Sequence, residues 1–363
     1  PPHNHAAMDG YAFAAGNPAA FSLRFCGSLA AGEICPDSVP AGAAVRIMTG
    51  APMPEGCDTV APFEDVAESD GIISFSKSFS AGDKVRRKGE DSLAGETLVR
   101  SGTLLRPQEI ALLAAMNIPK VPVACRPRGA LLSTGDELLE PGSLLLPGKI
   151  INSNSSALAA MLVDAGAEPL MRGIARDTLA DTTEKLASCL DAELILVSGG
   201  ASAGDRDHVC RAVSELGGEV LFSGVSIKPG KPFGFAIVRG IPLFIMPGNP
   251  VAAMVTFELF VRPMLLASMG LMRIFRPRVK AVLSEGFKNR GIRPHFAGAI
   301  LEAAGGLFRA SITGSQSSGR ILSLTQGNAL LFLRPETVYR AGDTVDALLT
   351  DSSAFMESIC RWD

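Results

Sequence analysis

The segment "LILVSGGASAGDRDHV" (Leu194–Val209) decides the expected fold. Apolar residues run into Ser198, and the pair Gly199–Gly200 separates them from a polar, helix-compatible stretch. A short apolar run bounded by glycine is typical of a buried strand, and glycine lets main-chain amides approach a ligand closely. A helix that follows would point its positive end at the same place. The segment therefore predicts a strand, a ligand-binding turn and a helix.

The same alternation of apolar strands and helical patterns begins at about Pro127. The segments are "GALLS", "SNSSALAAMLVDAG", "PLMRGIA", "TLADTTEKLASCLDA", "ELILVS", "DRDHVCRAVSELGG", "IPLFIM" and "NPVAAMVTFELFVRPML". Repeated β-α-β units predict a doubly wound, mostly parallel sheet with helices on both faces. The last segment contains Glu258, Arg262 and Pro263, which favour a packed core helix over a membrane span.

The regions on either side have the short strands and turns of all-β structure. From Phe21 to about Gly95, β-prone runs such as "AVRIM" and "IISFS" lie between turn signals, and after Arg276 "RVKAVLSEGF", "GAILEA", "LFRASIT", "NALLFLR" and "DTVDALL" predict a terminal β domain. Between them, "RPQEIALLAAMNIPKVPV" predicts a helix with Pro107 in its first turn, followed by a linker strand. The fold class is thus multidomain α/β plus all-β.

Composition excludes several classes of protein. The 363 residues, 47% hydrophobic, suffice for several cores. A net charge of −3 and a pI near 5.9 give no basic footprint for nucleic acid. Seven cysteines, odd in number and without a CxxC pair, suit a reducing cytoplasm. The opening "PPHNHAAMDGY" lacks the order of a signal peptide, and we expect no membrane association.

Three strand-end loops carry unusual chemistry: "LLSTGDEL" (Leu131–Leu138), "VSGGASAGDRD" (Val197–Asp207) and "FIMPGNPVA" (Phe244–Ala252). Parallel sheets bind ligands outside the carboxyl ends of their strands. If the sheet is parallel, polar side chains of these loops face one crevice. They are Asp136, Glu137, Asp205, Asp207 and Asn249.

The aspartates after the glycine pair have two interpretations. Asp205 and Asp207 could hold Mg²⁺ beside a bound phosphate, because Mg²⁺ is usually bound by one or two carboxylates plus substrate phosphates. They could instead cap the following helix and complement its dipole, which the spacing alone favours. No GxxxxGK[ST] or GxGxxG pattern is present, so neither a Walker loop nor a dinucleotide fingerprint supports the first interpretation.

Further polar candidates lie elsewhere in the chain. "SIKPGKPFGFA" (Ser226–Ala236) holds Lys228 and Lys231 in a proline-stiffened loop, which suits either an oxyanion or a surface turn. Ser153 and Asn154 stand at an expected helix start, where capping is the default role unless a ligand shares the site. In the front region, "AAMDGYAF", "RIMTGAPMPEG" and "RRKGEDS" are by default turns with ordinary charges.

Together the motifs resemble those of the molybdopterin molybdenumtransferase family, the molybdenum insertases of molybdenum cofactor biosynthesis, related to the insertase domain of gephyrin. The resemblance extends over "AMDGYA", "MTGAPMPEG", "RRKGED", "STGDEL", "NSNS", "SGGASAGDRD", "KPGKPFGFA", "MPGNPVAA" and "GSQSSGR". Each motif is weak, but nine in one order across nearly the whole chain are highly specific.

The resemblance implies a four-part protomer that forms a homodimer. An elongated linker and dimerisation domain would comprise 1–8 and 96–126, with a β domain at 9–95, an α/β pterin-binding domain at 127–275 and a C-terminal β barrel at 276–363. The chain starts so close to "AMDGYA" that an N-terminal helical part of the elongated domain is expected to be missing, which would weaken dimerisation.

The resemblance also implies the reaction: molybdenum from molybdate enters adenylylated molybdopterin, and AMP is released with the help of Mg²⁺. By similarity, the catalytic residues are Asp207, Glu137, Lys228 and Lys231, and the metal ligands are Asp205 and Asp207. The implied substrate-binding residues are Asp9, Thr49, Asp91, Ser153, Asn154, Ser198, Gly199, Gly200, Asn249, Arg293 and Ser318. Of these, Arg293 and Ser318 would neighbour molybdate, and Asp9, Thr49 and Asp91 would come from the other subunit.

Two departures and two rival functions accompany the resemblance. Asn4–Ala7 read "NHAA" where the family commonly has Asp-Asn-Ser-Ala, and Asp205 stands where the family often has Glu. The rivals are a molybdopterin adenylyltransferase, which uses the same kind of α/β module, and a non-catalytic scaffold related to gephyrin. The pterin-adenylylating enzyme and molybdoenzyme chaperones are further expected partners.

Overall fold

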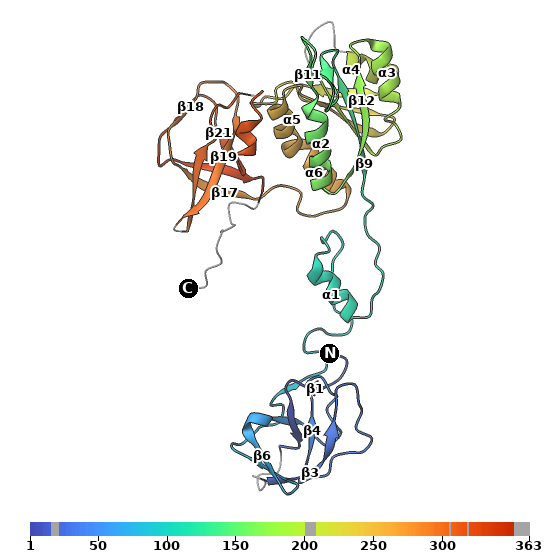
Figure 1. Cartoon of the computed structure of the whole chain (residues 1–363), viewed down its shortest axis with the longest axis vertical. Helices are drawn as coiled ribbons and strands as arrows, with labels where there is room; N and C mark the ends of the chain where they lie inside the picture. Colours follow the sequence, from blue (N-terminus) through green and yellow to red (C-terminus); the bar gives the residue numbers. More distant parts are fainter. Residues whose placement is uncertain (16–21, 200–207, 305, 318, 352–363) are drawn as a thin grey trace. The chain divides into compact units, whose positions relative to one another are not determined.

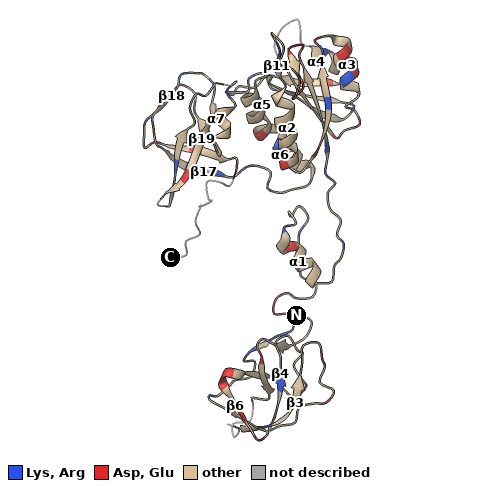
Figure 2. Cartoon of the chain, viewed as in Figure 1, with Lys and Arg blue, Asp and Glu red and all other residues tan. Residues whose placement is uncertain are grey.

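The computed structural model describes residues 1–15, 22–199, 208–304, 306–317 and 319–351. The chain divides into two compact units, Pro1–Arg100 and Ser101–Asp363, whose helices and strands are labelled in Figure 1. Acidic and basic residues are interspersed along both units (Figure 2).

The first unit is built on a six-stranded sheet in the order β5-β2-β4-β3-β7-β6. Its strands are β2 (Gly10–Phe13), β3 (Ser22–Leu29), β4 (Ala43–Ile47), β5 (Thr59–Pro62), β6 (Val66–Ser69) and β7 (Ile72–Phe75). Asp70 and Gly71 join β6 to β7 with φ of 50° and 75°, the positive values that a two-residue hairpin turn requires. The all-β character expected for the front of the chain is confirmed.

The N-terminal segment adds a short ribbon to this unit. Strand β1 (His5–Ala6) pairs antiparallel with β8 (Val85–Arg86), and the Ala7 N–H donates to the Lys84 carbonyl at 2.9 Å. These hydrogen bonds connect the first residues to the β unit. The grouping of 1–8 with 96–126 in an elongated domain stays a prediction.

Helix α1 (Pro107–Ala115) carries Pro107 in its first turn, as predicted. The linker strand predicted after this helix is wrong, because residues 117–127, all of them described, contain no strand. Pro119 and Pro122 have no backbone N–H to donate to a strand partner, and the segment between them is exposed. The apolar residues of this linker are therefore not part of a paired strand.

A second six-stranded sheet, in the order β12-β9-β13-β16-β15-β14, forms the centre of the other unit. The strands are β9 (Arg128–Thr134), β12 (Glu168–Ala175), β13 (Leu194–Ser198), β14 (Glu219–Ser223), β15 (Gly234–Val238) and β16 (Ile241–Met246). The first four in spatial order are parallel, with Val197 opposite Leu132 and Ile245. β15 and β14 are antiparallel. The mostly parallel sheet is confirmed.

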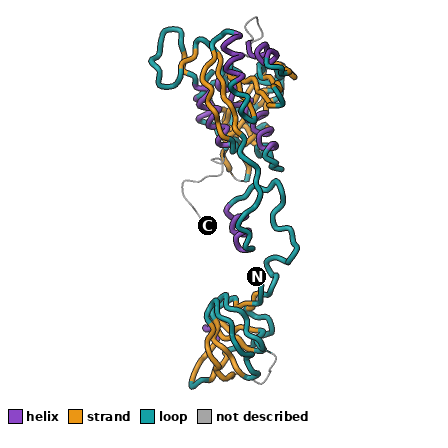
Figure 3. Tube along the Cα trace, turned by 90° about the vertical axis from the view of Figure 1, so that its right-hand side faces the viewer, coloured by secondary structure: helices purple, strands orange, loops and turns teal. Residues whose placement is uncertain are grey.

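Helices cover both faces of this sheet (Figure 3). One core joins it to α3 (Leu179–Ala187) and α4 (His208–Glu215). The other joins it to α2 (Ser153–Asp164), to the turn Phe257–Val261 that follows α5 (Pro250–Thr256), and to α6 (Arg262–Ser268). Leu158 and Leu162 of α2 are fully buried there, and each contributes about 2 kcal/mol from apolar burial. The sheet is doubly wound, as expected.

The helical run Pro250–Ser268 is long and apolar enough to cross a membrane, but 56% of its most apolar 18-residue stretch is buried. A π-helical turn, Phe257–Val261, joins α5 to α6, where Pro263 has no N–H for a regular helical bond. Phe257 and Val261 are fully buried against the sheet. The run is the packed core helix that the sequence predicted.

The chain ends in a closed five-stranded barrel in the order β17-β20-β19-β21-β23. Its strands are β17 (Arg278–Leu283), β19 (His295–Ala304), β20 (Leu307–Ile312), β21 (Ala329–Leu333) and β23 (Thr344–Leu349); β18 (Phe287–Asn289) pairs with β22 (Thr337–Tyr339), and α7 (Leu322–Thr325) is a single short helix. Closure leaves no free strand edge. The C-terminal barrel is confirmed.

Candidate functional site

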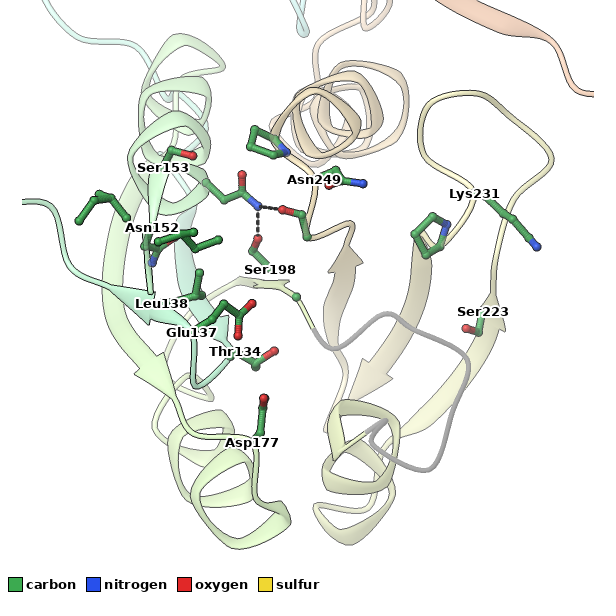
Figure 4. A pocket seen from close by; sticks show the side chains of 18 of the residues that line it. Thr134, Glu137, Leu138, Asn152, Ser153, Asp177, Ser198, Ser223, Lys231 and Asn249 are labelled. Carbon is green, nitrogen blue, oxygen red and sulfur yellow. Dashed lines mark hydrogen bonds between the residues drawn. The ribbon is translucent and has the colours of Figure 1, made fainter. Parts of the chain in front are cut away.

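A cavity of about 730 Å³ lies at the carboxyl ends of the parallel strands. The loops after β9 and β16 supply Glu137 and Asn249 to its wall, and β13 supplies Ser198, its last residue (Figure 4). The crevice predicted for parallel strand ends is therefore present. Gly200, Asp205 and Asp207 lie outside the described residues.

Gly199 makes a close approach to the neighbouring strand. Its φ is +99°, and a Cβ added to it would lie 2.5 Å from the Thr134 carbonyl oxygen and 2.9 Å from the Thr134 hydroxyl. Both the backbone conformation and the contact require glycine at this position. The turn after β13 thus brings main chain against the end of β9.

A hydrogen-bonded link joins the start of α2 to two strand ends. The Asn154 side-chain amide donates to the Ser198 hydroxyl oxygen at 2.8 Å and to the Gly248 carbonyl at 2.8 Å. All of these residues line the cavity. The default capping role expected for Ser153 and Asn154 is wrong, because Asn152 is the N-cap and its Oδ1 accepts from the Ser155 N–H. Asn152 leaves Asn154 available to connect the loops.

One wall of the cavity is acidic. Glu137 and Asp177 line it, and both are exposed. Asp136 is exposed beside them and exchanges hydrogen bonds with Asp177: each backbone N–H donates to the other's carboxylate at 3.3 Å. Among the described residues, no group of three or more His, Cys, Asp or Glu is placed to hold a metal ion. Any cation here would need ligands from a substrate or from residues beyond the described ones.

The cavity wall next to Glu137 is apolar (Figure 4). Leu138, Ile150 and Ile151 line the cavity from a two-stranded parallel ribbon, β10 (Leu138–Leu139) and β11 (Ile150–Ile151). Ile150 is 56% exposed and Ile151 is 37% exposed. Exposed apolar side chains beside polar ones are typical of small-molecule sites.

A second cavity, of about 430 Å³, shares Lys231 and Asn249 with the first. It brings Lys228 and Lys231 together with Arg293 of the barrel domain, as the sequence resemblance implied. Both lysines are exposed and Arg293 is half-buried. Gln316 and Ser317 complete this wall, and Ser318 lies outside the described residues.

The barrel domain holds the backbone of the lysine loop. The Lys228 N–H donates to the Pro294 carbonyl at 2.9 Å, and the Phe296 N–H donates to the Lys228 carbonyl at 2.7 Å. Arg293 Nη1 donates to the Ile227 carbonyl at 2.9 Å. The position of Lys228 is therefore set by residues about 65 positions later in the sequence.

His295 lies between these barrel contacts and is 1% exposed. Burial, together with the charge of Lys228, lowers its pKa to about 4. Neither ring nitrogen has a hydrogen-bond partner among the residues that the structure describes. The imidazole is therefore neutral near pH 7.

In the first unit, Asp9 and Thr49 are in contact. The Asp9 carboxylate accepts hydrogen bonds from the Thr49 hydroxyl at 2.6 Å and from its N–H at 2.7 Å. These bonds lower the pKa of Asp9 below its ordinary value. Asp91 is exposed in a bend, and no hydrogen bond or ion pair links it to Asp9 or Thr49 in the described part of the chain.

Several cavity residues had not been singled out from the sequence. Thr134 and Asp177 line the first cavity, and Gln316 and Ser317 line the second. Thr134 lies inside the quoted "STGDEL" motif, which was a usable signal. Asp177 follows β12, and only the parallel strand order would have placed it at this edge.

Comparison with known proteins identifies the family of this chain. Residues 1–117 match the family described as MoeA N-terminal region (domain I and II), residues 130–267 match "Probable molybdopterin binding domain", and residues 280–350 match MoeA C-terminal region (domain IV). Molybdopterin molybdenumtransferase 2 of Mycobacterium tuberculosis (strain CDC 1551 / Oshkosh) is 35% identical over 95% of this chain and 87% of its own length. This chain belongs to the molybdopterin molybdenumtransferase family.

Other members of the molybdopterin molybdenumtransferase family agree. The protein of that name from Nostoc sp. is 36% identical over 92% of this chain and 79% of its own length. The crystal structure of the molybdopterin biosynthesis MoeA protein from Pyrococcus horikosii superposes with a TM-score of 0.81 at 32% identity, covering 97% of this chain and 88% of that one. The resemblance inferred from the motifs is confirmed, and the chain is a transferase of molybdenum cofactor biosynthesis.

Proposed function

We propose that this molybdopterin molybdenumtransferase inserts molybdenum from molybdate into adenylylated molybdopterin and releases AMP. The observation that carries the proposal is the pair of cavities that share Lys231 and Asn249. One has the size and mixed polarity of a small-molecule site, and the other gathers three cationic side chains. A large substrate and a small oxyanion would meet at their common wall.

The first cavity supports binding of the adenylylated pterin. Its volume of about 730 Å³ lies in the usual range for ligand pockets. Ser153, Asn154, Ser198, Gly199 and Asn249 line it, and we assign substrate contacts to them and to Gly200. Hydroxyl and carboxamide groups orient a ligand while the apolar ribbon residues cover its rings.

The second cavity supports binding of molybdate. Lys228, Lys231 and Arg293 surround it, and charge-assisted hydrogen bonds from such groups to an oxyanion are short and strong. Arg293 has donors beyond the one given to Ile227. We also assign Ser318 to this subsite because it follows Ser317 of the wall.

The acidic wall fits Mg²⁺ as a partly substrate-held ion. Glu137 and Asp177 offer two carboxylates beside the cavity, and Mg²⁺ is usually bound by one or two carboxylates plus substrate phosphates. We assign Asp205 and Asp207 as further ligands, and a bound Mg²⁺ would neutralise phosphate charge. In this proposal an oxygen of water or of molybdate attacks the phosphoanhydride and AMP leaves. The chain's own residues position the two substrates and stabilise the charge that develops as this bond breaks.

We further propose that the enzyme works as a cytoplasmic homodimer. Ile110, Leu113, Ala114 and Ile118 line an apolar groove of about 410 Å³ on α1 and the turn after it, and Ile110 is 56% exposed. A second copy would cover this groove. Asp9, Thr49 and Asp91 of that copy would then complete the substrate site.

Two structural observations favour molybdenum insertion over the rival functions. A molybdopterin adenylyltransferase needs only the α/β module, whereas this chain also has the front β unit and the barrel. A non-catalytic scaffold has no need for the cationic subsite formed by the lysine loop and Arg293. Both observations favour insertion.

The test is to incubate the purified protein with adenylylated molybdopterin, molybdate and Mg²⁺ and to measure how much adenylylated pterin remains. We expect its consumption. Formation of adenylylated pterin from ATP and molybdopterin, without consumption in the presence of molybdate, would show that the protein is the adenylyltransferase. The absence of turnover in both reactions would support the scaffold.

A further inference from the structure

Two buried polar groups beside the first cavity have no hydrogen-bond partner in the described part of the chain. The Thr134 hydroxyl and the Asn154 carboxamide oxygen make no hydrogen bond with any residue that the structure describes. Thr134 is 6% exposed and Asn154 is 7% exposed, and both residues line the cavity. A buried polar group without a partner costs stability, and a ligand in the cavity that paired with these two atoms would remove that cost.

The orientation of Asn154 is fixed. Its amide nitrogen donates to Ser198 and to the Gly248 carbonyl, both at 2.8 Å. Because only a donor can satisfy that carbonyl, the side chain cannot exchange its nitrogen and oxygen. The unpaired atom is therefore Oδ1, which accepts hydrogen bonds and cannot donate them.

An acceptor-only atom excludes phosphate oxygens, which at neutral pH are acceptors themselves. Lys231, a cationic side chain that lines the same cavity, suits a phosphate better than Asn154 Oδ1 does. In the same cavity, Ile150 and Ile151 expose apolar surface that a flat ring would cover. The polar and apolar groups together suit a nitrogen heterocycle rather than an anion.

We infer that Thr134 and Asn154 bind the edge of a nitrogen heterocycle of the substrate. Asn154 Oδ1 accepts a hydrogen bond from a ring N–H or amino group, and the Thr134 hydroxyl bonds a ring nitrogen or carbonyl oxygen. This rests on the proposed function, in which the substrate carries two such rings, a pterin and an adenine. Thr134 is thereby a specificity-determining residue of the same site.

Thr134→Val is the decisive variant because valine has the same shape without the hydroxyl. We expect the KM for adenylylated molybdopterin to rise about tenfold, the loss typical of one hydrogen bond to a ligand. The midpoint of urea unfolding should stay the same or rise, since none of the described residues forms a hydrogen bond with this hydroxyl. Thr134→Ser, which keeps the hydroxyl, should restore most of the affinity.

Thr182→Val is the matched control. Thr182 is 1% exposed on α3, which packs on the other face of the sheet, and its hydroxyl donates to the Arg176 carbonyl. We expect no change in the KM for adenylylated molybdopterin in this control.

Asn154→Asp keeps an acceptor but loses the amide donors. It should lower both the free energy of unfolding and the affinity for adenylylated molybdopterin.

AMP and a 6-substituted pterin, each tested as a competitor of turnover, distinguish the two rings. If Thr134→Val weakens inhibition by the pterin alone, the pterin is bound here; if it weakens inhibition by AMP alone, the adenine is. If neither competitor inhibits the wild type, the KM for adenylylated molybdopterin alone decides whether Thr134 contacts the substrate.

The inference is overturned if Thr134→Val has the wild-type KM for adenylylated molybdopterin, or if it loses stability without a change in that KM. Failure of the wild type to consume adenylylated molybdopterin would instead overturn the proposed function.

Discussion

The amide nitrogen of Asn154 lies 2.8 Å from the hydroxyl oxygen of Ser198 and donates a hydrogen bond to it. This bond joins the first turn of α2 to the end of β13. Both residues line the large cavity, so the same contact supports the fold and shapes the proposed substrate site.

Ser198→Ala removes this acceptor. We expect the free energy of unfolding to fall by about 1 kcal/mol, the usual contribution of one hydrogen bond, and the KM for adenylylated molybdopterin to rise. The matched control is Ser155→Ala, because the buried Ser155 hydroxyl donates to the Asn152 carbonyl without lining the cavity. Urea denaturation and steady-state kinetics check both variants. An equal rise in KM for the control would show that the effect is only structural.

Gly199→Ala tests the close approach of the turn to β9. The new Cβ would lie 2.5 Å from the Thr134 carbonyl oxygen, and the positive φ adds strain. We expect a loss of stability of about 2–4 kcal/mol and a loss of activity. Gly217→Ala has a similar positive φ of 77° but no atom within 4 Å of its Cβ, so it should cost only about 1 kcal/mol. Comparable thermal midpoints for the two variants would contradict the proposed clash.

Substitutions of the two loop lysines should have different effects on the KM values for the two substrates. Lys231 lines both cavities, whereas Lys228 lines the second. We expect Lys228→Met to raise the KM for molybdate about tenfold and to leave the KM for adenylylated molybdopterin unchanged. Lys231→Met should raise both. Lys185→Met, at the end of α3, is the control and should change neither. Unchanged molybdate dependence in Lys228→Met would remove this residue from the oxyanion subsite.

The neutral, buried His295 predicts a pH dependence of stability. Its pKa falls from 6.5 to about 4 in the folded protein, so its contribution is complete above pH 6.5 and is lost as the pH falls towards 4. Over that range the unfolded chain binds a proton that the folded chain does not, at a cost of about 3 kcal/mol.

His295→Phe should remove this part of the pH dependence, since a phenyl ring can pack against Phe287, whose ring centroid lies 5.5 Å from that of His295. The measurement is the free energy of unfolding at pH 7 and pH 4.5. His3→Phe, at an exposed position, is the control. Parallel losses of stability in the wild type and in His295→Phe would show that other groups carry the pH dependence.

The strand-end chemistry could be predicted because it depends on periodicity and on strand direction. Glu137, Ser198 and Asn249 follow apolar runs, and parallel pairing brings the ends of β9, β13 and β16 to one edge. The family motifs added the lysine loop and Arg293, which the structure places around one cavity. Local sequence and topology were sufficient for the strand-end residues, whereas Arg293 required the family resemblance.

The remaining features depend on contacts that no local pattern encodes. The bonds between Lys228 and the barrel residues Pro294 and Phe296 are long-range. The choice of Asn152 as the cap, which frees Asn154, depends on side-chain geometry at one helix start. The apolar linker after α1 resembled a strand, but strand formation needs a partner, which propensity cannot report.

The central claim is that AMP release and molybdenum insertion are coupled, and one time course tests it most directly. Wild-type protein with adenylylated molybdopterin and Mg²⁺ is followed with and without molybdate, and AMP and metal-bound pterin are quantified in the same samples. We predict that both products appear together, in a ratio near one, and that they depend on molybdate. The account would be contradicted if AMP were released equally with and without molybdate and no metal-bound pterin formed.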